Sequence, residues 1–336
     1  MRNYLFLINL INYRIMLTIA LPSSGPLYQS TIEFFNNAGI TIKKSSLRSY
    51  TGTTSFDDNV KMIFQRQTDI PSSINNEIAD IGVMGLDRYL ENNDFSDTNI
   101  IIEKMGYGQC DLVVAVPQKW GAINNIKDLV NYSVEKKLKI ATKYPNQTAK
   151  YLNKNNLESY EIVTTSGSVE VAPEMGLADM IVDISSTGNT IRANNLKILD
   201  DGYILFSEAT MIANLSSINK SNEKFESAKK ILRFILGYLN SKKFNTIIFN
   251  INSKDESTLV NNLNKYISLK GVIGPTIAKV FSNDQKNWYA VTIIVSNENL
   301  NAAINDLDEL AAEGVTVIEN KLVFNKTLNV DKLLKK

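Results

Sequence analysis

The chain has 336 residues, of which 44% are hydrophobic and 21% charged, so it is long enough for two or three domains with substantial cores. Its 36 basic and 35 acidic residues nearly balance, which excludes a nucleic-acid binder that relies on overall positive charge. One cysteine and no histidine are present. These counts exclude an intramolecular disulfide framework, a cysteine-ligated zinc cluster, a Ser-His-Asp triad and a histidine-ligated metal.

The first fifteen residues differ in character from the rest of the chain. Residue 2 is basic and residues 4–11 are mostly apolar, but asparagines interrupt this run and no small-residue cleavage site comes after it. The run is also too short to span a bilayer. We interpret 1–15 as a leader that is disordered or not translated, with the first domain starting at Met16; a signal peptide is the alternative. No later segment resembles a membrane span, so we expect a cytoplasmic protein without a membrane partner.

Alternating strand and helix patterns extend from about residue 17 to residue 240. Apolar runs bounded by turn residues predict strands at 17–21, 60–64, 79–85, 112–117, 139–142 and 178–184. Helices are expected at 27–38, 74–78, from 190 onward and at 225–239, and a polar surface loop is expected at 216–224. This alternation predicts an α/β architecture rich in parallel strand pairs, with functional groups at the carboxyl ends of the strands.

After about residue 241 the pattern changes. It predicts strands at 244–251, 275–281, 288–295 and 315–318, with a turn at 282–285 between the second and third. Two helices are expected, at 256–267 and at 300–312, the second of them closed by Gly314. The order β-α-β-β-α-β is typical of a ferredoxin-like domain; another α+β sandwich is the alternative.

The segment 181–192 carries the strongest chemical signal in the chain. A strand is followed there by a loop rich in hydroxyls and then by a helix. Gly188 allows close backbone approach, and the N–H groups at a helix start favour an anion. Because the lysine of a P-loop is absent, the segment suits a sugar phosphate better than a nucleoside triphosphate; a capped turn without a ligand is the alternative. The candidate ligands are Asp183, placed to accept from ribose hydroxyls, and Ser186, Thr187, Gly188, Asn189 and Thr190.

Several motifs, in chain order, resemble those of the ATP phosphoribosyltransferase family, the first enzyme of histidine biosynthesis. The longest runs from Glu170 to Thr190 and reads E-x5-G-x-A-x2-I-x-D-I-x2-T-G-x-T. The resemblance covers about 17–215, and the tail is similar to the regulatory domain of the family's long form. The other matching motifs are R-x2-D-I-P from Arg66, A-D-I-G-V-x-G from Ala79, G-x-G-x-C from Gly106, I-A-T-x-Y-P from Ile140 and G-S-V-E-x-A-P from Gly167.

The resemblance implies a two-lobed catalytic unit like that of periplasmic binding proteins, followed by a ferredoxin-like regulatory domain. It places the first lobe at 16–108 and 200–240, the second at 109–199 and the regulatory domain at 241–336. The implied reaction transfers the phosphoribosyl group of phosphoribosyl pyrophosphate (PRPP) to N1 of ATP and releases pyrophosphate. It needs Mg²⁺, held largely by the diphosphate, but no protein nucleophile and no assigned acid or base, because alignment and electrostatic stabilisation dominate.

By the same resemblance, further residues face the cleft on the ATP or diphosphate side. The pair near 66–69 can instead make contacts within a loop, the lysine can be solvated, and the glutamate can be an ordinary surface carboxylate. We interpret Asp87 as a helix N-cap, Cys110 as inert core and the Phe34–Phe35 pair as core packing. The implied cleft residues are Ser24, Gly25, Arg66, Asp69, Lys143 and Glu170.

The loop after the first strand departs from the family pattern. Relatives carry two cations there in a Lys-Gly-Arg-Leu-like motif, whereas this chain has Ser23 and Pro26. A family arginine after the cysteine is replaced by Asp111. Either Lys143 and Arg66 compensate for the lost charge, or the protein is a catalytically weakened or regulatory paralogue. A two-lobed solute-binding protein, which would need export, and a small-molecule sensor are the alternatives from other classes.

The tail carries the expectations about regulation. By resemblance to the long form, free histidine binds the tail and inhibits, and the enzyme shifts between dimer and hexamer. Feedback requires histidine to favour one global state over another. The loop at 271–276 matches the long form only loosely, and Thr292 stands where some relatives carry a histidine. The apolar strands at 275–281 and 288–295 offer a surface for association between subunits.

Overall fold

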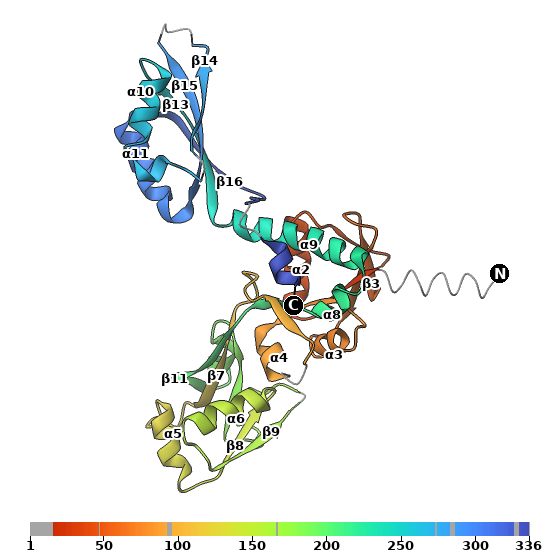
Figure 1. Cartoon of the computed structure of the whole chain (residues 1–336). Coiled ribbons are helices and arrows are strands. Elements are labelled where there is room, and N and C mark those ends of the chain that lie inside the picture. Colours follow the sequence, from red (N-terminus) through yellow and green to blue (C-terminus); the bar gives the residue numbers. More distant parts are fainter. Residues whose placement is uncertain are drawn as a thin grey trace, which may run out of the picture. The chain divides into compact units, whose positions relative to one another are not determined.

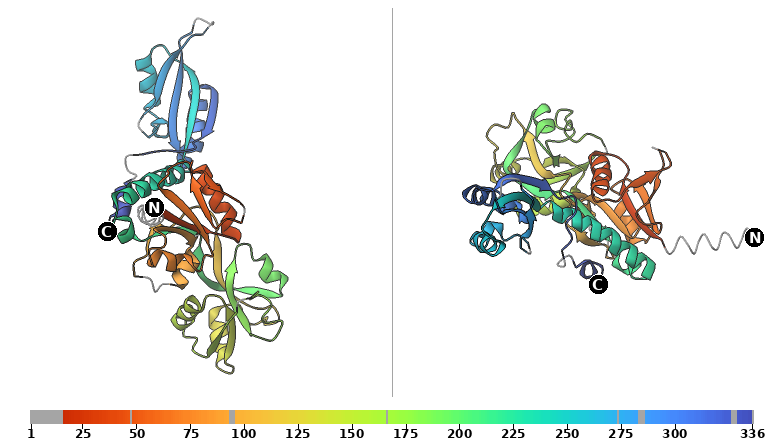
Figure 2. Two further views of the ribbon diagram at one scale, coloured as in Figure 1. Left: turned by 90° about the vertical axis from the view of Figure 1, so that its right-hand side faces the viewer. Right: turned by 90° about the horizontal axis from the view of Figure 1, so that it is seen from above.

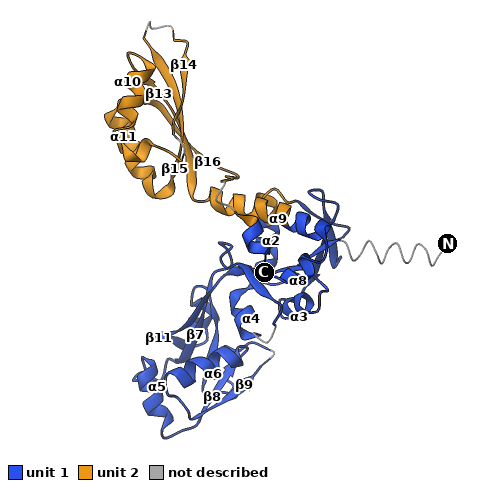
Figure 3. Ribbon diagram, viewed as in Figure 1, with its two compact units in different colours: residues 1–34, 41–228, 331–336 blue, residues 35–40, 229–330 orange. Residues whose placement is uncertain are grey.

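The computed structural model describes residues 16–46, 48–92, 96–165, 167–272, 274–282, 286–325 and 329–335. The expected leader, residue 273 of the loosely matching loop and residues 283–285 of the expected turn lie outside the described residues. The chain forms two compact units (Figure 3), a first unit of residues 1–34, 41–228 and 331–336 and a second unit of residues 35–40 and 229–330. Within the described ranges no helix is both long and apolar enough to cross a membrane. The domain boundaries and the cytoplasmic location stay predictions.

The larger sheet of the first unit has seven strands in the order β2-β3-β4-β1-β5-β12-β6 (Figure 1). The predicted buried strand at 17–21 is confirmed, since all six residues of β1 are buried. β1 pairs in parallel with β4 and β5, whereas β12 runs antiparallel to both β5 and β6. The strands are β1 (Leu17–Pro22), β2 (Ile42–Lys44), β3 (Thr51–Thr54), β4 (Val60–Gln65), β5 (Ile81–Gly85), β6 (Asn99–Ile102) and β12 (Ala209–Ala213). We call this sheet with its helices the first lobe.

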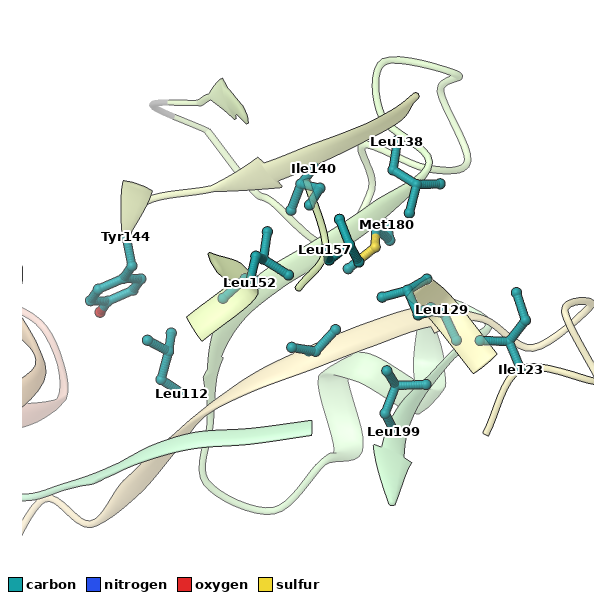
Figure 4. Close-up of a cluster of buried hydrophobic side chains, with 13 residues drawn as sticks. Leu112, Ile123, Leu129, Leu138, Ile140, Tyr144, Leu152, Leu157, Met180 and Leu199 are labelled. Atoms are coloured by element: carbon teal, nitrogen blue, oxygen red, sulfur yellow. The ribbon is translucent and has the colours of Figure 1, made fainter. Parts of the chain in front are cut away.

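A second sheet, with its helices, forms the second lobe of the same unit. Its five strands lie in the order β11-β7-β10-β8-β9, and β10, β8 and β9 are parallel. Its apolar core includes Leu112, Ile140 and Met180, with Tyr144 at the edge of the cluster (Figure 4). The strands are β7 (Cys110–Pro117), β8 (Leu138–Thr142), β9 (Tyr160–Thr164), β10 (Met180–Ser185) and β11 (Leu196–Ser207).

The helices of the first unit correct two sequence predictions. The helix expected at 74–78 is α3 (Ile70–Asn75), because a proline at its start favours the earlier beginning and Glu77 has a positive φ of 58°. The expected surface loop at 216–224 instead contains α8 (Leu215–Ile218) and the start of α9 (Asn222–Ser241). The other helices are α2 (Pro26–Asn37), α4 (Leu86–Glu91), α5 (Ile126–Ser133), α6 (Pro145–Lys154), α7 (Asn189–Ala193) and α12 (Val330–Leu334).

The second unit contains a four-stranded antiparallel sheet in the order β14-β15-β13-β16. Helices α10 (Glu256–Leu263) and α11 (Leu300–Glu309) lie on one side of this sheet in Figure 1, and Figure 2 shows the same sheet turned by 90°. The predicted β-α-β-β-α-β order is therefore confirmed. The strands are β13 (Phe244–Asn252), β14 (Thr276–Val280), β15 (Trp288–Ser296) and β16 (Glu313–Glu319).

The ends of the two tail helices differ from the sequence prediction. α10 stops at Leu263, and a short 3₁₀ turn at Ile267–Leu269 comes after it. α11 stops at Glu309 because Ala311 adopts a left-handed conformation with φ 53°, and Gly314 lies inside β16 instead of closing the helix.

Candidate functional site

The loop between β10 and α7 holds the predicted phosphate ligands. Gly188 has φ +71°, a left-handed conformation that favours glycine, and its N–H donates to Ser185 Oγ at 2.9 Å. Asp183, at the end of β10, is 7% exposed and accepts a hydrogen bond from the backbone N–H of Ile184 at 2.9 Å. The turn is therefore shaped by the chain itself. Four of its residues are exposed, namely Ser186, Thr187, Asn189 and Thr190.

An arginine that sequence analysis did not single out completes this loop. Arg192 Nη2 donates to the backbone oxygen of Thr187 at 3.0 Å and to Asn189 Oδ1 at 2.7 Å. The guanidinium thus reaches back over the turn from inside α7. The sequence signal that could have indicated Arg192 is its four-residue spacing from Gly188, because residues four apart on a helix lie on the same face.

Two predicted residues from other segments act on the buried Asp183 carboxyl. Burial raises the pKa of Asp183, and the hydrogen bond from Ile184 N–H partly opposes that rise. The ammonium of Lys143 lowers the pKa of this carboxyl, while the negative charge of Glu170 raises it. Lys143 comes directly after β8 and Glu170 lies in the chain between β9 and β10, so two predicted residues from other segments act on one predicted carboxylate.

Asp87 is not the helix N-cap that we expected. The N-cap of α4 is Gly85, which makes no side-chain cap, whereas Asp87 is buried within the first turn of the helix. Tyr144 Oη donates to one carboxylate oxygen of Asp87 at 2.6 Å, and Ser207 Oγ donates to the other at 2.7 Å. The Asp87 N–H in turn donates to Ser207 Oγ at 2.9 Å. Since Asp87 belongs to the first lobe and both partners belong to the second, this carboxylate joins the lobes.

The single thiol lies beside this junction. Burial is the main cause that raises the pKa of Cys110 to about 11, and the negative charge of Asp87 adds to the rise. The thiol therefore stays protonated at neutral pH and is a poor nucleophile. This agrees with the expectation that it is chemically inert.

The rest of α4 fixes the chain that bears Lys143. The Arg88 guanidinium lies 4.2 Å from the centroid of the Tyr144 ring, and its Nη1 donates to the backbone oxygen of Lys143 at 3.3 Å. The buried carboxylate of Glu91 accepts the first N–H groups of α6, from Asn146 at 2.8 Å and from Gln147 at 3.0 Å. Sequence analysis did not single out Arg88 or Glu91, because the groups they contact are more than fifty residues away.

A pocket of about 430 Å³ lies on the first lobe, where the neighbouring parallel strands β1 and β4 end. Three predicted residues, Ser24, Arg66 and Asp69, line it, and all three are exposed. Gly25 does not line the pocket, but it lies next to it with φ +79°. The full lining is Ser23, Ser24, Tyr50, Phe64, Gln65, Arg66 and Asp69.

Another cation lies beside this pocket. Lys44, which sequence analysis did not single out, places Nζ 4.1 Å from the centroid of the Phe64 ring, and Phe64 lines the pocket. Within the part of the chain that is described, no hydrogen bond or ion pair links the pocket residues Ser24, Arg66 and Asp69 to Asp183, Lys143 or Glu170. The predicted site residues therefore form two groups, one on each lobe.

Comparison with known proteins finds relatives of this chain along most of its length. The family model described as "ATP phosphoribosyltransferase" matches residues 66–235, and the model described as "HisG, C-terminal domain" matches residues 242–320. An ATP phosphoribosyltransferase from Methanocaldococcus jannaschii is 35% identical over 305 residues, covering 90% of this chain and 98% of the relative. One from Nitrobacter hamburgensis is 30% identical and covers 92% of this chain and 94% of the relative.

Relatives are also found in plants and among solved structures. The chloroplastic ATP phosphoribosyltransferase 2 of Arabidopsis thaliana is 28% identical over 93% of this chain and 78% of the relative. A chain in the ATP phosphoribosyl transferase (HisG:HisZ) complex from Thermotoga maritima superposes with a TM-score of 0.52 at 29% identity. It covers 66% of this chain and 99% of its own length, so that solved chain is shorter than this one.

Proposed function

This chain belongs to the ATP phosphoribosyltransferase family, in its long form, and from that premise we propose how its residues share the work of the family's reaction. It is a pentosyltransferase that transfers the phosphoribosyl group of PRPP to N1 of ATP and releases pyrophosphate, the first step of histidine biosynthesis. Family membership decides against the solute-binding alternative. In the proposal, the loop at 186–190 binds the 5′-phosphate of PRPP, and Asp183 contacts the ribose hydroxyls.

The observation that carries the loop assignment is the left-handed turn at Gly188, five residues after a buried carboxylate. A phosphate seated at 186–190 meets the hydroxyls of Ser186, Thr187 and Thr190 and the start of a helix. The ribose then extends toward Asp183. This arrangement supports sugar-phosphate binding because one strand-to-helix connection carries both the loop for the phosphate and a buried carboxylate for the ribose hydroxyls.

The proposed mechanism uses no covalent intermediate with the protein. The bond between the anomeric carbon and the pyrophosphate oxygen breaks, the electron pair leaves with pyrophosphate, and N1 of ATP forms the new bond to carbon. Positive charge develops on the ribose, and the ionised Asp183 carboxylate, held in a poorly solvated position, stabilises it. Binding both substrates in line supplies the remaining rate enhancement.

We propose that the first-lobe pocket receives the ATP or diphosphate side, with Ser24 and Arg66 as donors and Asp69 beside them. Lys143, whose charge acts on Asp183, balances phosphate charge at the ribose end. Lys44 adds positive charge beside the pocket, where Ser23 and Pro26 replace the cations common in the family. This supports compensation over the alternative of a weakened paralogue.

Mg²⁺ is the proposed cofactor. Among the described residues no group of three or more His, Cys, Asp or Glu is placed to hold a metal ion. Mg²⁺ commonly keeps several waters and takes only one or two carboxylates together with substrate phosphates. The available oxygens, those of Asp183 and Glu170, suit that mode. Mg²⁺ bound with the diphosphate would neutralise the leaving group.

We also propose that the second unit regulates the enzyme through free histidine and through association of subunits as dimer and hexamer. A cavity of about 590 Å³ lies there, and Thr292, singled out from the sequence, lines it. None of its lining residues is charged, so the ammonium and carboxylate of histidine must meet hydroxyls, Asn320, backbone groups or a second subunit. The lining is Val272, Gly274, Pro275, Thr276, Thr292, Ile294, Asn320, Leu322, Val323, Phe324 and Asn325.

A point substitution tests regulation better than truncation at residue 240. Such a truncation also removes α12, which is part of the first unit and whose Leu334 is fully buried. Thr292→Tyr should fill the cavity and abolish histidine inhibition, while Thr258→Tyr, at an exposed position on α10, should not. Equal inhibition of both variants and the wild type, at unchanged oligomeric mass, would end the regulatory proposal.

The activity itself is tested by pyrophosphate release. The full chain should release pyrophosphate only when ATP, PRPP and Mg²⁺ are all present. Release at a rate typical of biosynthetic enzymes, of order 1–10 per second, supports compensation by the cations of the two lobes. A rate at background with folded protein would support the weakened paralogue instead.

A further inference from the structure

We propose that Arg192 is a phosphate-binding and positioning residue: its guanidinium holds the turn at 187–189 in shape and donates to the 5′-phosphate of PRPP. The inference rests on the proposed function of that loop. Arg192 lies outside the loop's sequence motif, and its proposed role affects KM for PRPP more than kcat.

The geometry of Arg192 divides its donors into two sets. A guanidinium carries five N–H donors in a planar fork. The two on Nη2 are satisfied within the loop, by the Thr187 carbonyl at 3.0 Å and by Asn189 Oδ1 at 2.7 Å. The three on Nε and Nη1 have no acceptor among the residues that the structure describes. Nη2 therefore braces the turn, and Nη1 and Nε keep donors for an anion.

Arg192 Nη1 lies next to the glycine of the turn. A Cβ built on Gly188 would lie 2.8 Å from Arg192 Nη1 and 3.5 Å from Cζ. The guanidinium thus covers the position that any other side chain would occupy, on a residue whose positive φ already favours glycine. Gly188 consequently serves two purposes, since it allows the turn and it makes room for the cation.

The negative charges and used donors around the loop explain why a bound phosphate would require Arg192. The Gly188 N–H already donates to Ser185 Oγ, so the loop offers one backbone donor fewer than its shape suggests. The neighbouring Asp183 and Glu170 are both acidic, and their field opposes a phosphate. Hydrogen bonds from the remaining guanidinium donors to a phosphate are charge-assisted, and such bonds are among the stronger ones.

The test compares Arg192→Gln and Arg192→Lys with the full-length wild type. The control is Lys197→Gln, which removes one positive charge five residues further along the chain, where Nζ donates to Asn124 Oδ1 at 2.8 Å. Calorimetry with ribose 5-phosphate reports binding of the 5′-phosphate and ribose, without the diphosphate and without the reaction. Steady-state kinetics at saturating ATP and Mg²⁺ report KM for PRPP and kcat separately.

For Arg192→Gln we expect the affinity for ribose 5-phosphate to fall, and KM for PRPP to rise, by about 10- to 100-fold. We expect kcat to change by less than about threefold, because Arg192 would bind the 5′-phosphate equally in the ground state and the transition state. Arg192→Lys should recover part of the loss, because it restores the charge without the fork. Lys197→Gln should match the wild type in both measurements.

Other outcomes distinguish a failure of the Arg192 role from a failure of the loop assignment. If Arg192→Gln binds ribose 5-phosphate like the wild type while Gly188→Val does not, the Arg192 inference fails and the loop assignment stands. If both variants bind like the wild type, the proposed function of the loop fails as well. A fall in kcat with unchanged KM for PRPP, or a loss that Arg192→Lys does not relieve at all, would also overturn the role of Arg192 in phosphate binding.

Discussion

The two units of this molecule differ in whether they bury charged side chains. The first unit buries five carboxylates, Asp80, Asp87, Glu91, Asp183 and Glu208. In the second unit, the described residues bury no charged side chain, and their buried polar residues are serines. The core of the second unit is built from residues such as Ile247, Phe249 and Val291.

The difference shows where the fold must fix the position of polar groups in addition to packing an apolar core. A buried carboxylate destabilises a fold unless its oxygens are satisfied, so an apolar core is the simpler solution when only stability matters. In the first unit each of these carboxylates accepts hydrogen bonds, and three of them lie where the lobes join. Asp87 and Glu91 accept from the second lobe, and Glu208 accepts from Gly106 N–H at 3.3 Å and Gln109 Nε2 at 3.2 Å, beside the return of the chain to β12.

The largest effect predicted from this comparison is on stability. Asp87→Leu should lower the free energy of unfolding by about 3 kcal/mol, because the buried hydroxyls of Tyr144 and Ser207 both lose their acceptor. Urea denaturation of the full chain measures the change. In the second unit Asp255→Asn, at an exposed helix cap, should leave stability close to that of the wild type. Equal losses in the two variants would remove the contrast between the units.

The matching prediction for the second unit concerns the apolar contacts of Phe324. Phe324 is 45% exposed; its ring lies 5.4 Å from that of Phe234 and fits against Gly237, where an added Cβ would come within 2.7 Å of it. Phe324→Ala should cost about 1 kcal/mol, since roughly half of a large apolar side chain loses its burial. Phe324→Leu should recover most of it. A loss as large as that of Asp87→Leu would contradict the account.

The pH dependence of substrate use gives a smaller effect. Because burial raises the pKa of Asp183, the carboxylate proposed to contact the ribose becomes protonated at a higher pH than an ordinary aspartate. We therefore expect kcat/KM for PRPP to be full at neutral pH and to fall as the pH drops, with an acid limb at a higher pH than an ordinary aspartate would give. Asp183→Asn should lower kcat/KM and remove this limb. An unchanged limb in the variant would assign it to another group.

The smallest effect concerns the single thiol. With its pKa raised to about 11, Cys110 should react slowly with iodoacetamide at about pH 8 in the folded chain. In concentrated urea the same residue should react at the rate of an ordinary cysteine. Mass spectrometry of a single alkylation site measures both rates, and equal rates would show that the thiol is not protected.

The sequence predicted the parts of the fold that depend on local pattern. The buried run at 17–21, the turn at Gly188 and the β-α-β-β-α-β order of the tail all depend on residues close together in the chain. The junction between the lobes could not be predicted in this way. Asp87 receives its hydrogen bonds from residues 57 and 120 positions away, so its local context indicated only a helix start.

The candidate site shows the same division. The loop proposed to bind phosphate was singled out by residue type and spacing, and the first-lobe pocket gathers Ser24, Arg66 and Asp69, whose motifs suggested a common site. Strands β11 and β12 were not expected, because the mixed burial of β11 and the continuous burial of β12 give no clean period, and the partners of Glu91 and Glu208 lie far from them in the chain. Arg192 was missed because a cation in a short helix has no distinctive pattern of its own.

Calorimetric titration of PRPP into Gly188→Val tests the central claim most directly. Valine at this position must adopt a strained positive φ, and its Cβ, 2.8 Å from Arg192 Nη1, displaces the guanidinium that braces the turn at 186–190. The account predicts that PRPP binds the wild type and that its affinity for the variant falls at least about 100-fold, with circular dichroism unchanged. PRPP affinity equal to that of the wild type in a folded variant would contradict the assignment of this loop.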